Sequence, residues 1–408
     1  MARKSVLDCA VIGAGPAGLA MSAALGNRGV DHIVLERGRP GETWRSQRWN
    51  SFRLNTPGWM NQLLGEQPDH AFAAGAEVVM RLQALAAMHP VRRGVRVKKL
   101  APNSDGFTVQ TSDEVLHTRT IVVATGDQNV PRVPPLAQAL PDWLAQQHTA
   151  EYRGPDSLPP GGVLVVGSAQ SGCQIAEDLL SGGRRVFLAT SPAGRMPWRN
   201  RGRDTLEWLV DVGFWDQRPQ DLPDPSMMNA AQPILAAGGR SLSLQSLARS
   251  GATLVGRPLT MSDETLMFDD SVNANIAASD AFAARLRTIM DEHIQRHQLD
   301  APPSEPDDTD APVDLHPPNT LRLREEHISS VVWCTGFTGD FTWLSPELCS
   351  AAGQPRRDGT AGPIPGLWYV GLRWLTRRRS GILFGFPRDA EMIADAAKAH
   401  LDGVGHHP

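Results

Sequence analysis

One stretch, residues 5–37, limits the possible folds of this chain more than any other. A short apolar run leads into V-I-G-A-G-P-A-G, where Gly13, Gly15 and Gly18 have the spacing G-x-G-x-x-G. Good helix formers follow, and a second apolar run ends at Glu36. Strand, glycine turn, helix, strand and acid in this order predict a β-α-β unit that binds a dinucleotide.

The chemistry of this unit follows from backbone geometry. Gly13 permits the tight turn, Gly15 lets a pyrophosphate approach the backbone, and Gly18 lets helix and strand pack closely. The helix N-terminus would offer free N–H groups and its positive dipole end to the phosphates, while Glu36 would accept hydrogen bonds from a ribose. A glycine-rich turn without a ligand is the alternative. The predicted cofactor contacts of this unit are Gly13, Gly15, Pro16, Ala17, Gly18, Glu36 and Arg37.

Composition narrows the class of protein further. The chain has 408 residues, enough for two or three domains, and a net charge of −4. This balance gives no electrostatic basis for binding nucleic acid or an anionic membrane. No apolar run is long enough to span a bilayer. The four cysteines form no C-x-x-C pair, so we expect a reduced, cytoplasmic protein without a dithiol redox centre.

A second β-α-β unit is predicted at 162–189, where V-L-V-V runs into G-S-A-Q-S-G. Ala169 replaces the middle glycine, and no acid follows the second strand. Hydroxyl and arginine side chains stand there instead, which suits a 2′-phosphate and predicts NADPH over NADH. A solvated face is the alternative for each arginine. The predicted contacts are Gly167, Ser168, Gln170, Ser171, Ser191 and Arg195, with Arg199, Arg201 and Arg203 as further candidates.

The segment 38–59 is dense in tryptophan and arginine, which suit stacking on a flat ring and pairing with phosphate. Its pattern W-R-x-x-R-W-x-S-F-R-L-N-T-P resembles the flavin-wrapping loop of bacterial and plant flavin-containing monooxygenase-like proteins. The A-T-G strand end at 124–126 and the strand at 364–372 resemble segments that close around FAD in that family. The resemblance implies FAD contacts at Trp44, Arg45, Leu54, Thr56, Val97, Ala124, Thr125, Gly126, Gly371 and Leu372.

The remaining chain is less specific. Residues 141–153 resemble the F-x-G-x-x-x-H-x-x-x-Y monooxygenase fingerprint in their second half only, and we expect a structural role for His148. Residues 242–268 read as a helix and two strands that complete the second domain, and 272–298 as a long helix. A mobile loop is expected at 301–318. A solvated loop is expected at 377–379, with arginines that anchor phosphate or substrate as the alternative.

The expected fold class is therefore α/β, with two Rossmann-like dinucleotide-binding domains in the FAD/NAD(P)-binding superfold. Residues 1–154 and 321–408 would form a discontinuous FAD-binding domain. Residues 155–320 would form the NADPH-binding domain with an insertion, and the role of 204–320 stays open.

The resemblance implies a class B flavoprotein monooxygenase. NADPH would reduce FAD, the reduced flavin would form a C4a-hydroperoxide with O2, and one oxygen atom would pass to a small organic substrate. Asn55 is a candidate to hydrogen-bond the peroxide. An NADPH-dependent reductase or oxidase without oxygen insertion, and a flavin-binding protein without catalysis, stay open. So do the choice among N-, S- and C-oxygenation and a homodimeric state.

Overall fold

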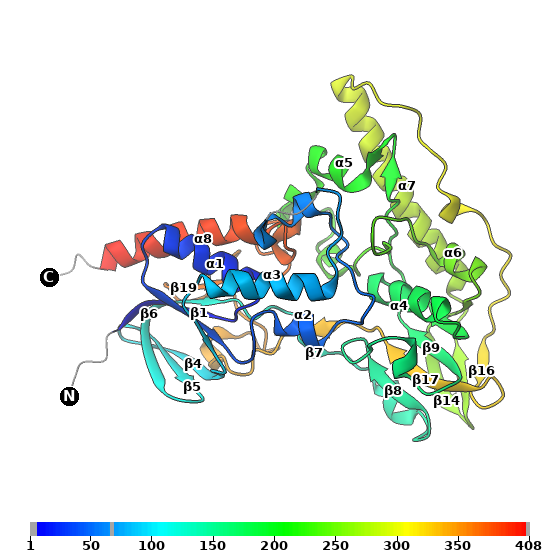
Figure 1. Ribbon diagram of the computed structural model, residues 1–408, viewed down its shortest axis with the longest axis horizontal. Helices are drawn as coiled ribbons and strands as arrows, with labels where there is room; N and C mark the ends of the chain where they lie inside the picture. The colour runs from blue at the N-terminus through cyan, green and yellow to red at the C-terminus, as the bar shows by residue number, and fades with distance from the viewer. Residues whose placement is uncertain (1–5, 66–68, 405–408) are drawn as a thin grey trace.

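The computed structural model describes residues 6–65 and 69–404 of the chain. Two sheets, each covered by helices, form the two lobes seen in Figure 1. The first lobe holds the N-terminal unit together with the C-terminal helix, and the second holds the middle of the chain. The α/β class with Rossmann-like sheets is thereby confirmed.

The first sheet has the strand order β3-β2-β1-β6-β5-β4, with β19 paired to β6. Its centre is parallel, while β4 and β5 are joined to β6 by antiparallel pairing. The strands are β1 Leu7–Ile12, β2 His32–Glu36, β3 Val91–Arg93, β4 Val97–Asn103, β5 Gly106–Thr111, β6 Val115–Val123 and β19 Leu367–Tyr369.

Both faces of this sheet are buried, because alternate residues of a strand point to opposite sides. Val11 packs in the cluster under the helices, whereas its neighbour Ile12 belongs to the cluster on the other face. The helices over the first cluster are α1 Pro16–Asn27, α3 Gly75–Ala87 and α8 Phe386–Val404 (Figure 1). An unbroken apolar run such as Cys9–Ile12 is what a doubly covered parallel strand requires.

The second sheet is parallel, in the order β13-β10-β9-β17-β8. Its elements are β8 Ala145–His148, β9 Gly162–Val166, α4 Gln170–Ser181, β10 Val186–Ala189, α6 Leu244–Arg249, β13 Thr253–Val255 and β17 Ile328–Trp333. β8 and β17 pair into this sheet although both lie outside residues 155–320.

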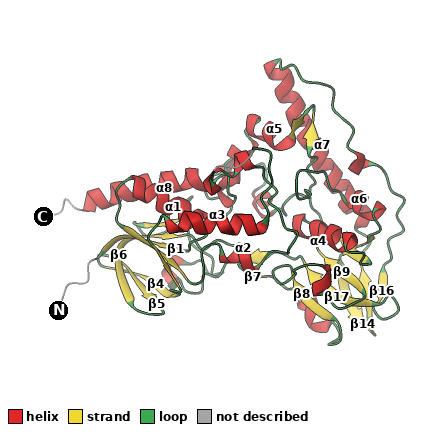
Figure 2. Ribbon diagram, viewed as in Figure 1, coloured by secondary structure: helices red, strands yellow, loops and turns green. Residues whose placement is uncertain are grey.

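The region after β13 differs from expectation. Only β13 joins the second sheet, whereas β14 Pro258–Ser262 and β15 Thr265–Phe268 form a separate antiparallel sheet with β16 Thr320–Arg322. The long helix is present as α7 Val272–His297. The following segment, 298–319, runs along the outside of the second lobe, as the coil in Figure 2 shows.

Two features of the first sheet concern strand limits. Gly94, with φ of +75°, lies between β3 and β4 and separates them. The strand that leads to the A-T-G segment at 124–126 is β6, which is continuous from Val115 to Val123.

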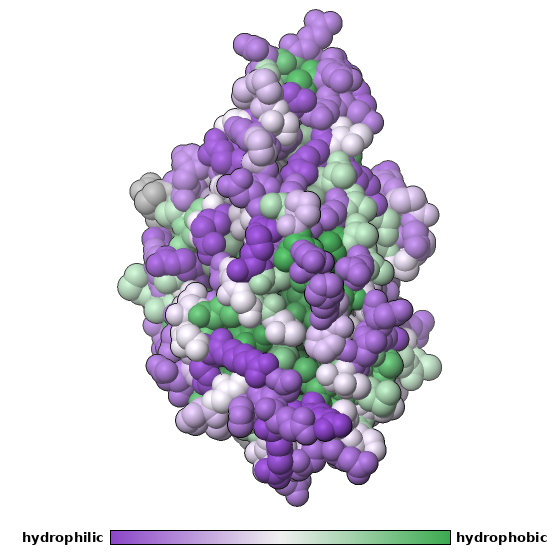
Figure 3. Space-filling model, turned by 90° about the vertical axis from the view of Figure 1, so that its right-hand side faces the viewer, coloured by the Kyte–Doolittle hydropathy of each residue, from purple (hydrophilic) through white to green (hydrophobic). Residues whose placement is uncertain are grey.

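The remaining α-helices of the described residues are α2 Glu42–Ser46 and α5 Thr205–Asp211. Short strand pairs are β7 Val130–Pro131 with β18 Phe337–Thr338, and β11 Arg199–Asn200 with β12 Arg203–Asp204. Among the described residues, none of the helices combines the length and apolarity that crossing a bilayer demands. From the side of the second lobe, apolar surface gathers near the middle of the face, with polar residues around it (Figure 3).

Candidate functional site

The first glycine turn has a different steric demand at each glycine. A Cβ on Gly13, whose φ is +109°, would lie 2.7 Å from the carbonyl oxygen of Ala124. A Cβ on Gly18 would lie 1.9 Å from the carbonyl oxygen of Gly13. At Gly15 a Cβ would meet no atom within 4 Å. Two glycines therefore serve internal packing, and the third faces open space at the N-terminus of α1.

That open space is a cavity of about 480 Å³ at the carboxyl ends of β1, β2 and β6. Its position is the one at which open parallel sheets bind nucleotides. The cavity wall includes two buried polar atoms, Gln47 Oε1 and Thr125 Oγ1, that have no hydrogen-bond partner among the described residues. Buried polar groups normally have partners, so this wall fits a polar ligand such as a dinucleotide.

Glu36 lies on the cavity wall with 8% of its surface exposed. One carboxylate oxygen accepts a hydrogen bond from the Ala14 N–H and the other from the Gly38 N–H, both at 2.8 Å. These bonds fix the carboxylate at the end of β2. A carboxylate has further acceptor capacity, so Glu36 remains able to receive a ribose hydroxyl.

Arg48 is the most unusual cation on the wall. Burial lowers its pKa to about 10, and no ion pair to Arg48 occurs among the described residues. Its guanidinium carbon lies 5.2 Å from the Trp44 ring centroid and 5.4 Å from that of Phe52, while Nη1 donates to the Gln47 carbonyl. A desolvated guanidinium without a carboxylate partner is suited to an anionic ligand.

The structure brings together about half of the residues predicted for cofactor binding. The predicted residues on the cavity wall are Gly13, Gly15, Pro16, Ala17, Glu36, Arg37, Trp44, Val97, Ala124, Thr125, Gly126 and Gly371. Gly18 lies behind the wall in the packing of α1, and Leu54 and Leu372 are core residues. Arg45 is outside the wall, with Nε 4.0 Å from Glu42.

Two polar residues of the loop at 54–56 also lie outside the cavity wall. Thr56 Oγ1 donates to Asn61 Oδ1 at 2.8 Å. Asn55 Oδ1 accepts from Gln174 Nε2 at 2.7 Å, and the same Gln174 atom donates to the Leu235 carbonyl. Asn55 therefore links this loop to α4 of the second unit.

The second glycine turn repeats the geometry of the first. A Cβ on Gly172 would lie 1.7 Å from the Gly167 carbonyl oxygen, and one on Gly167 would lie 2.6 Å from that of Cys334. Ala169 has φ −75° and ψ −171°, close to the −75° and −179° of Gly15. The alanine thus keeps the backbone conformation of the turn. The Ser168 hydroxyl donates to the Ser191 carbonyl and accepts from the Ser191 N–H, which joins the turn to the segment after β10. Gln170 and Ser171 are the first two residues of α4.

The arginines predicted to meet a 2′-phosphate already have carboxylate partners. Arg195 is 2% exposed; its Nε donates to Asp280 Oδ1 at 2.7 Å, and Nη2 is 2.5 Å from Asp310 Oδ1. The other pairs are Arg199 with Asp204, Arg201 with Asp291, and Arg203 with Glu207 and Asp211. These contacts give Arg195 an internal structural role, so its assignment to the phosphate has no support from its surroundings.

Segments expected to be mobile or solvated are held by specific contacts. Asp307 and Asp310 of the 301–318 segment lie beside Arg195, and Arg249 donates to two of its carbonyls. The expectation that residues 377–379 form a solvated loop is wrong. Arg378 lies 4.0 Å from the Phe214 ring centroid, and burial lowers its pKa to about 10.

The linker residues His148 and Tyr152 are buried. His148 Nδ1 accepts from the Ala150 N–H, so Nε2 carries the proton and donates to the Gly336 carbonyl at 3.0 Å. Burial lowers the pKa of this imidazole. Tyr152 Oη donates to Asp178 Oδ2 at 2.7 Å. His148 thus bonds the segment after β17, and Tyr152 bonds α4, which supports the structural role expected for His148.

Sequence reasoning missed part of the wall. Arg96 and Lys98 flank the predicted Val97, and Arg48 lies within the same W-R-x-x-R-W run as Trp44. Their closeness in the sequence to these predicted contacts could have indicated that they line the cavity. Asp340 and Trp343 reach the wall from the segment after β17, where no local pattern indicated them.

Two β-α-β units, the first opening onto a polar-walled cavity, define an oxidoreductase of the two-dinucleotide class. Residues 10–211 match the family model "Pyridine nucleotide-disulphide oxidoreductase". Among curated proteins it is 26% identical over 405 residues to "Uncharacterized oxidoreductase CzcO-like" of Geobacillus kaustophilus (strain HTA426), covering 97% of this chain and 99% of that one.

Two further similarities agree with the resemblance noted in the sequence. The chain is 30% identical over 240 residues to "Indole-3-pyruvate monooxygenase YUCCA1" of Oryza sativa subsp. japonica, covering 56% of this chain and 59% of that protein. A solved flavin-containing monooxygenase from Stenotrophomonas maltophilia has a TM-score of 0.67 at 19% identity, covering 97% of this chain and 99% of that chain. The resemblance to flavin-containing monooxygenases is thereby confirmed.

Proposed function

We propose that this protein is an FAD-dependent, NADPH-consuming monooxygenase that transfers one oxygen atom from O2 to a small organic substrate. The observation that carries the proposal is the cavity at the first glycine turn, with its partnerless polar atoms and its desolvated arginine. When bound there, FAD would supply the redox chemistry, namely uptake of a hydride from NADPH and activation of O2.

The protein's own residues would bind and orient the cofactors. Gly15 and the N-terminus of α1 would receive the pyrophosphate, and Glu36 the ribose. The N-terminus of α8 would favour negative charge on the bound ring, since Phe386 at its start lines the cavity. The second turn, at Gly167 and Ser168, would hold NADPH.

A dithiol reductase is the weaker alternative. The four cysteines are free thiols, and burial raises the pKa of Cys9 and Cys334 to about 12 and raises that of Cys173 as well. Reactive thiols have lowered pKa values. Free thiols also suit a reducing compartment, so we propose a cytoplasmic location.

The function can be tested in two steps. The FAD-loaded protein is first mixed with NADPH without oxygen, and isotopically labelled O2 is then added together with a panel of small amines, sulfides and ketones. A monooxygenase bleaches the flavin with NADPH and places one labelled oxygen atom in a product. Release of all NADPH electrons as H2O2, for every substrate class, would instead assign an oxidase. A flavin that NADPH does not reduce would assign a non-catalytic flavoprotein.

Asn55 lies outside the cavity wall, and we propose that it would help couple NADPH consumption to product formation. Its oxygen is held by Gln174, so the amide orientation is fixed. Asn55→Ala should raise the ratio of H2O2 to product while FAD remains bound, and Asn50→Ala, an exposed asparagine of the same segment, is the control. Unchanged coupling in Asn55→Ala would remove this residue from the mechanism.

A further inference from the structure

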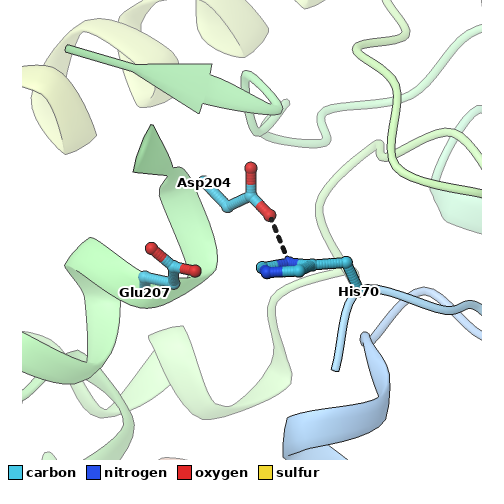
Figure 4. Close-up of side chains that lie close together, drawn as sticks. All are labelled: His70, Asp204 and Glu207. Atoms are coloured by element: carbon cyan, nitrogen blue, oxygen red, sulfur yellow. Dashed lines mark ion pairs between the residues drawn. The ribbon is translucent and has the colours of Figure 1, made fainter. Parts of the chain in front are cut away.

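Three potential metal ligands from two distant segments converge outside the dinucleotide sites. His70 lies in the loop before α3, whereas Asp204 precedes α5 and Glu207 lies in its first turn. Figure 4 shows the three side chains pointing toward one shared space. One ligand atom from each residue lies within 4.8 Å of the others.

Asp204 is the buried member of this cluster. Its side chain is 9% exposed, and among the described residues its carboxylate accepts no hydrogen bond. The nearest potential partners are the Arg199 guanidinium, with Nη1 3.4 Å from Oδ1, and the His70 ring, with Nδ1 3.8 Å from Oδ2. Both distances exceed those of charge-assisted hydrogen bonds, so a buried carboxylate here is incompletely compensated.

The carboxylate oxygens divide between arginine and the shared space. Asp204 presents Oδ1 to Arg199, and Glu207 presents Oε2 to Arg203 Nε at 3.2 Å. This leaves Asp204 Oδ2 beside the imidazole, and Glu207 contributes one carboxylate oxygen to the same cluster. Arg203 is also paired with Asp211 at 2.9 Å. The three carboxylates of Asp204, Glu207 and Asp211 therefore share two guanidinium groups, those of Arg199 and Arg203. The local net charge of −1 favours a cation.

We propose that His70, Asp204 and Glu207 form a binding site for a divalent transition-metal ion of the Zn²⁺ type. An imidazole nitrogen with two carboxylate oxygens suits such ions, whereas Mg²⁺ and Ca²⁺ prefer oxygen ligands throughout.

Zinc–ligand bonds of about 2.0–2.2 Å require the three donor atoms to move closer to one another than they lie in this structure. The His70 side chain is 71% exposed and free to make that movement. Binding would tie the loop that carries His70 in the first lobe to α5 of the 204–240 region.

Zinc titration of the full-length, chelator-treated chain tests the site, with a competing chromophoric chelator as readout. Two histidine pairs that could bind zinc elsewhere are replaced by alanine in the parent protein and in every variant. They are His293 and His297, whose ring centroids are 4.4 Å apart, and the sequence-adjacent His406 and His407. We expect one zinc ion per chain and no competition by Mg²⁺. His70→Ala and Glu207→Gln should each weaken zinc binding at least tenfold.

The matched control is His316→Ala, because His316 and Asp314 form an exposed histidine–aspartate pair at 3.6 Å that has no third ligand within the described part of the chain. Zinc affinity should be unchanged in this variant. Circular dichroism checks that Glu207→Gln, the less buried carboxylate, remains folded. Absence of a zinc ion, or equal affinity in His70→Ala and its parent, would overturn the proposal. FAD content and NADPH turnover do not enter this readout.

Discussion

Replacement of Arg48 by methionine should weaken FAD binding without destabilising the FAD-free protein. The fall of its pKa to about 10 corresponds to about 3 kcal/mol of unfavourable desolvation of the cation. Methionine keeps the contact with Trp44 and Phe52 but removes the charge. The lost cation–π and hydrogen-bond contributions are about 1 kcal/mol each, so the free protein should keep or gain stability.

An anionic ligand beside Arg48 would recover much of the same desolvation energy. We therefore expect the dissociation constant of FAD to rise by about 10- to 100-fold in Arg48→Met. Flavin fluorescence quenching on titration of FAD-free protein measures the affinity, and urea unfolding measures the stability. Arg53→Met, an exposed arginine in the same loop that lies outside the cavity wall, should change neither quantity by much. A destabilised free protein with unchanged FAD affinity would refute this reasoning.

Three further predictions concern other parts of the fold. Gly15→Ala should leave the FAD-free protein nearly as stable but weaken FAD binding, whereas Gly18→Ala should destabilise the protein itself, since their added Cβ atoms meet open space and a carbonyl at 1.9 Å respectively; equal stability of the two variants in urea unfolding would contradict this. Tyr152→Phe should lower the free energy of unfolding by about 1.5–3 kcal/mol, because Asp178 loses a buried hydrogen-bond donor; a loss below that range, measured by urea unfolding, would show that solvent replaces the phenol. Because the pKa of His148 is lowered, the unfolded chain binds a proton first as pH falls below 6.5, so folding stability declines there; urea unfolding above and below this pH should show a smaller decline in His148→Gln, and an unchanged decline would assign it to other groups.

The fold class could be read from the sequence because the glycine turns are governed by local sterics. Gly13 and Gly18 are required by carbonyl oxygens within the same unit or on the neighbouring strand, and this requirement leaves a fixed spacing in the chain. The same reasoning found most of the cavity wall contributed by β1, β2 and β6. Ala169 replaces the middle glycine of the second turn, and its backbone angles match those of Gly15 in the first.

Only the tertiary structure decided which arginines are available to a ligand. Arg195 stands at the position expected for a phosphate contact, yet Asp280, 85 residues further along the chain, packs against it. In the sequence Arg48 is one of several arginines in its segment. What distinguishes it is a desolvated guanidinium that has no ion pair among the described residues. Local backbone geometry is encoded over a few residues, whereas the partner of a charge depends on which distant segments the fold brings within a few ångströms.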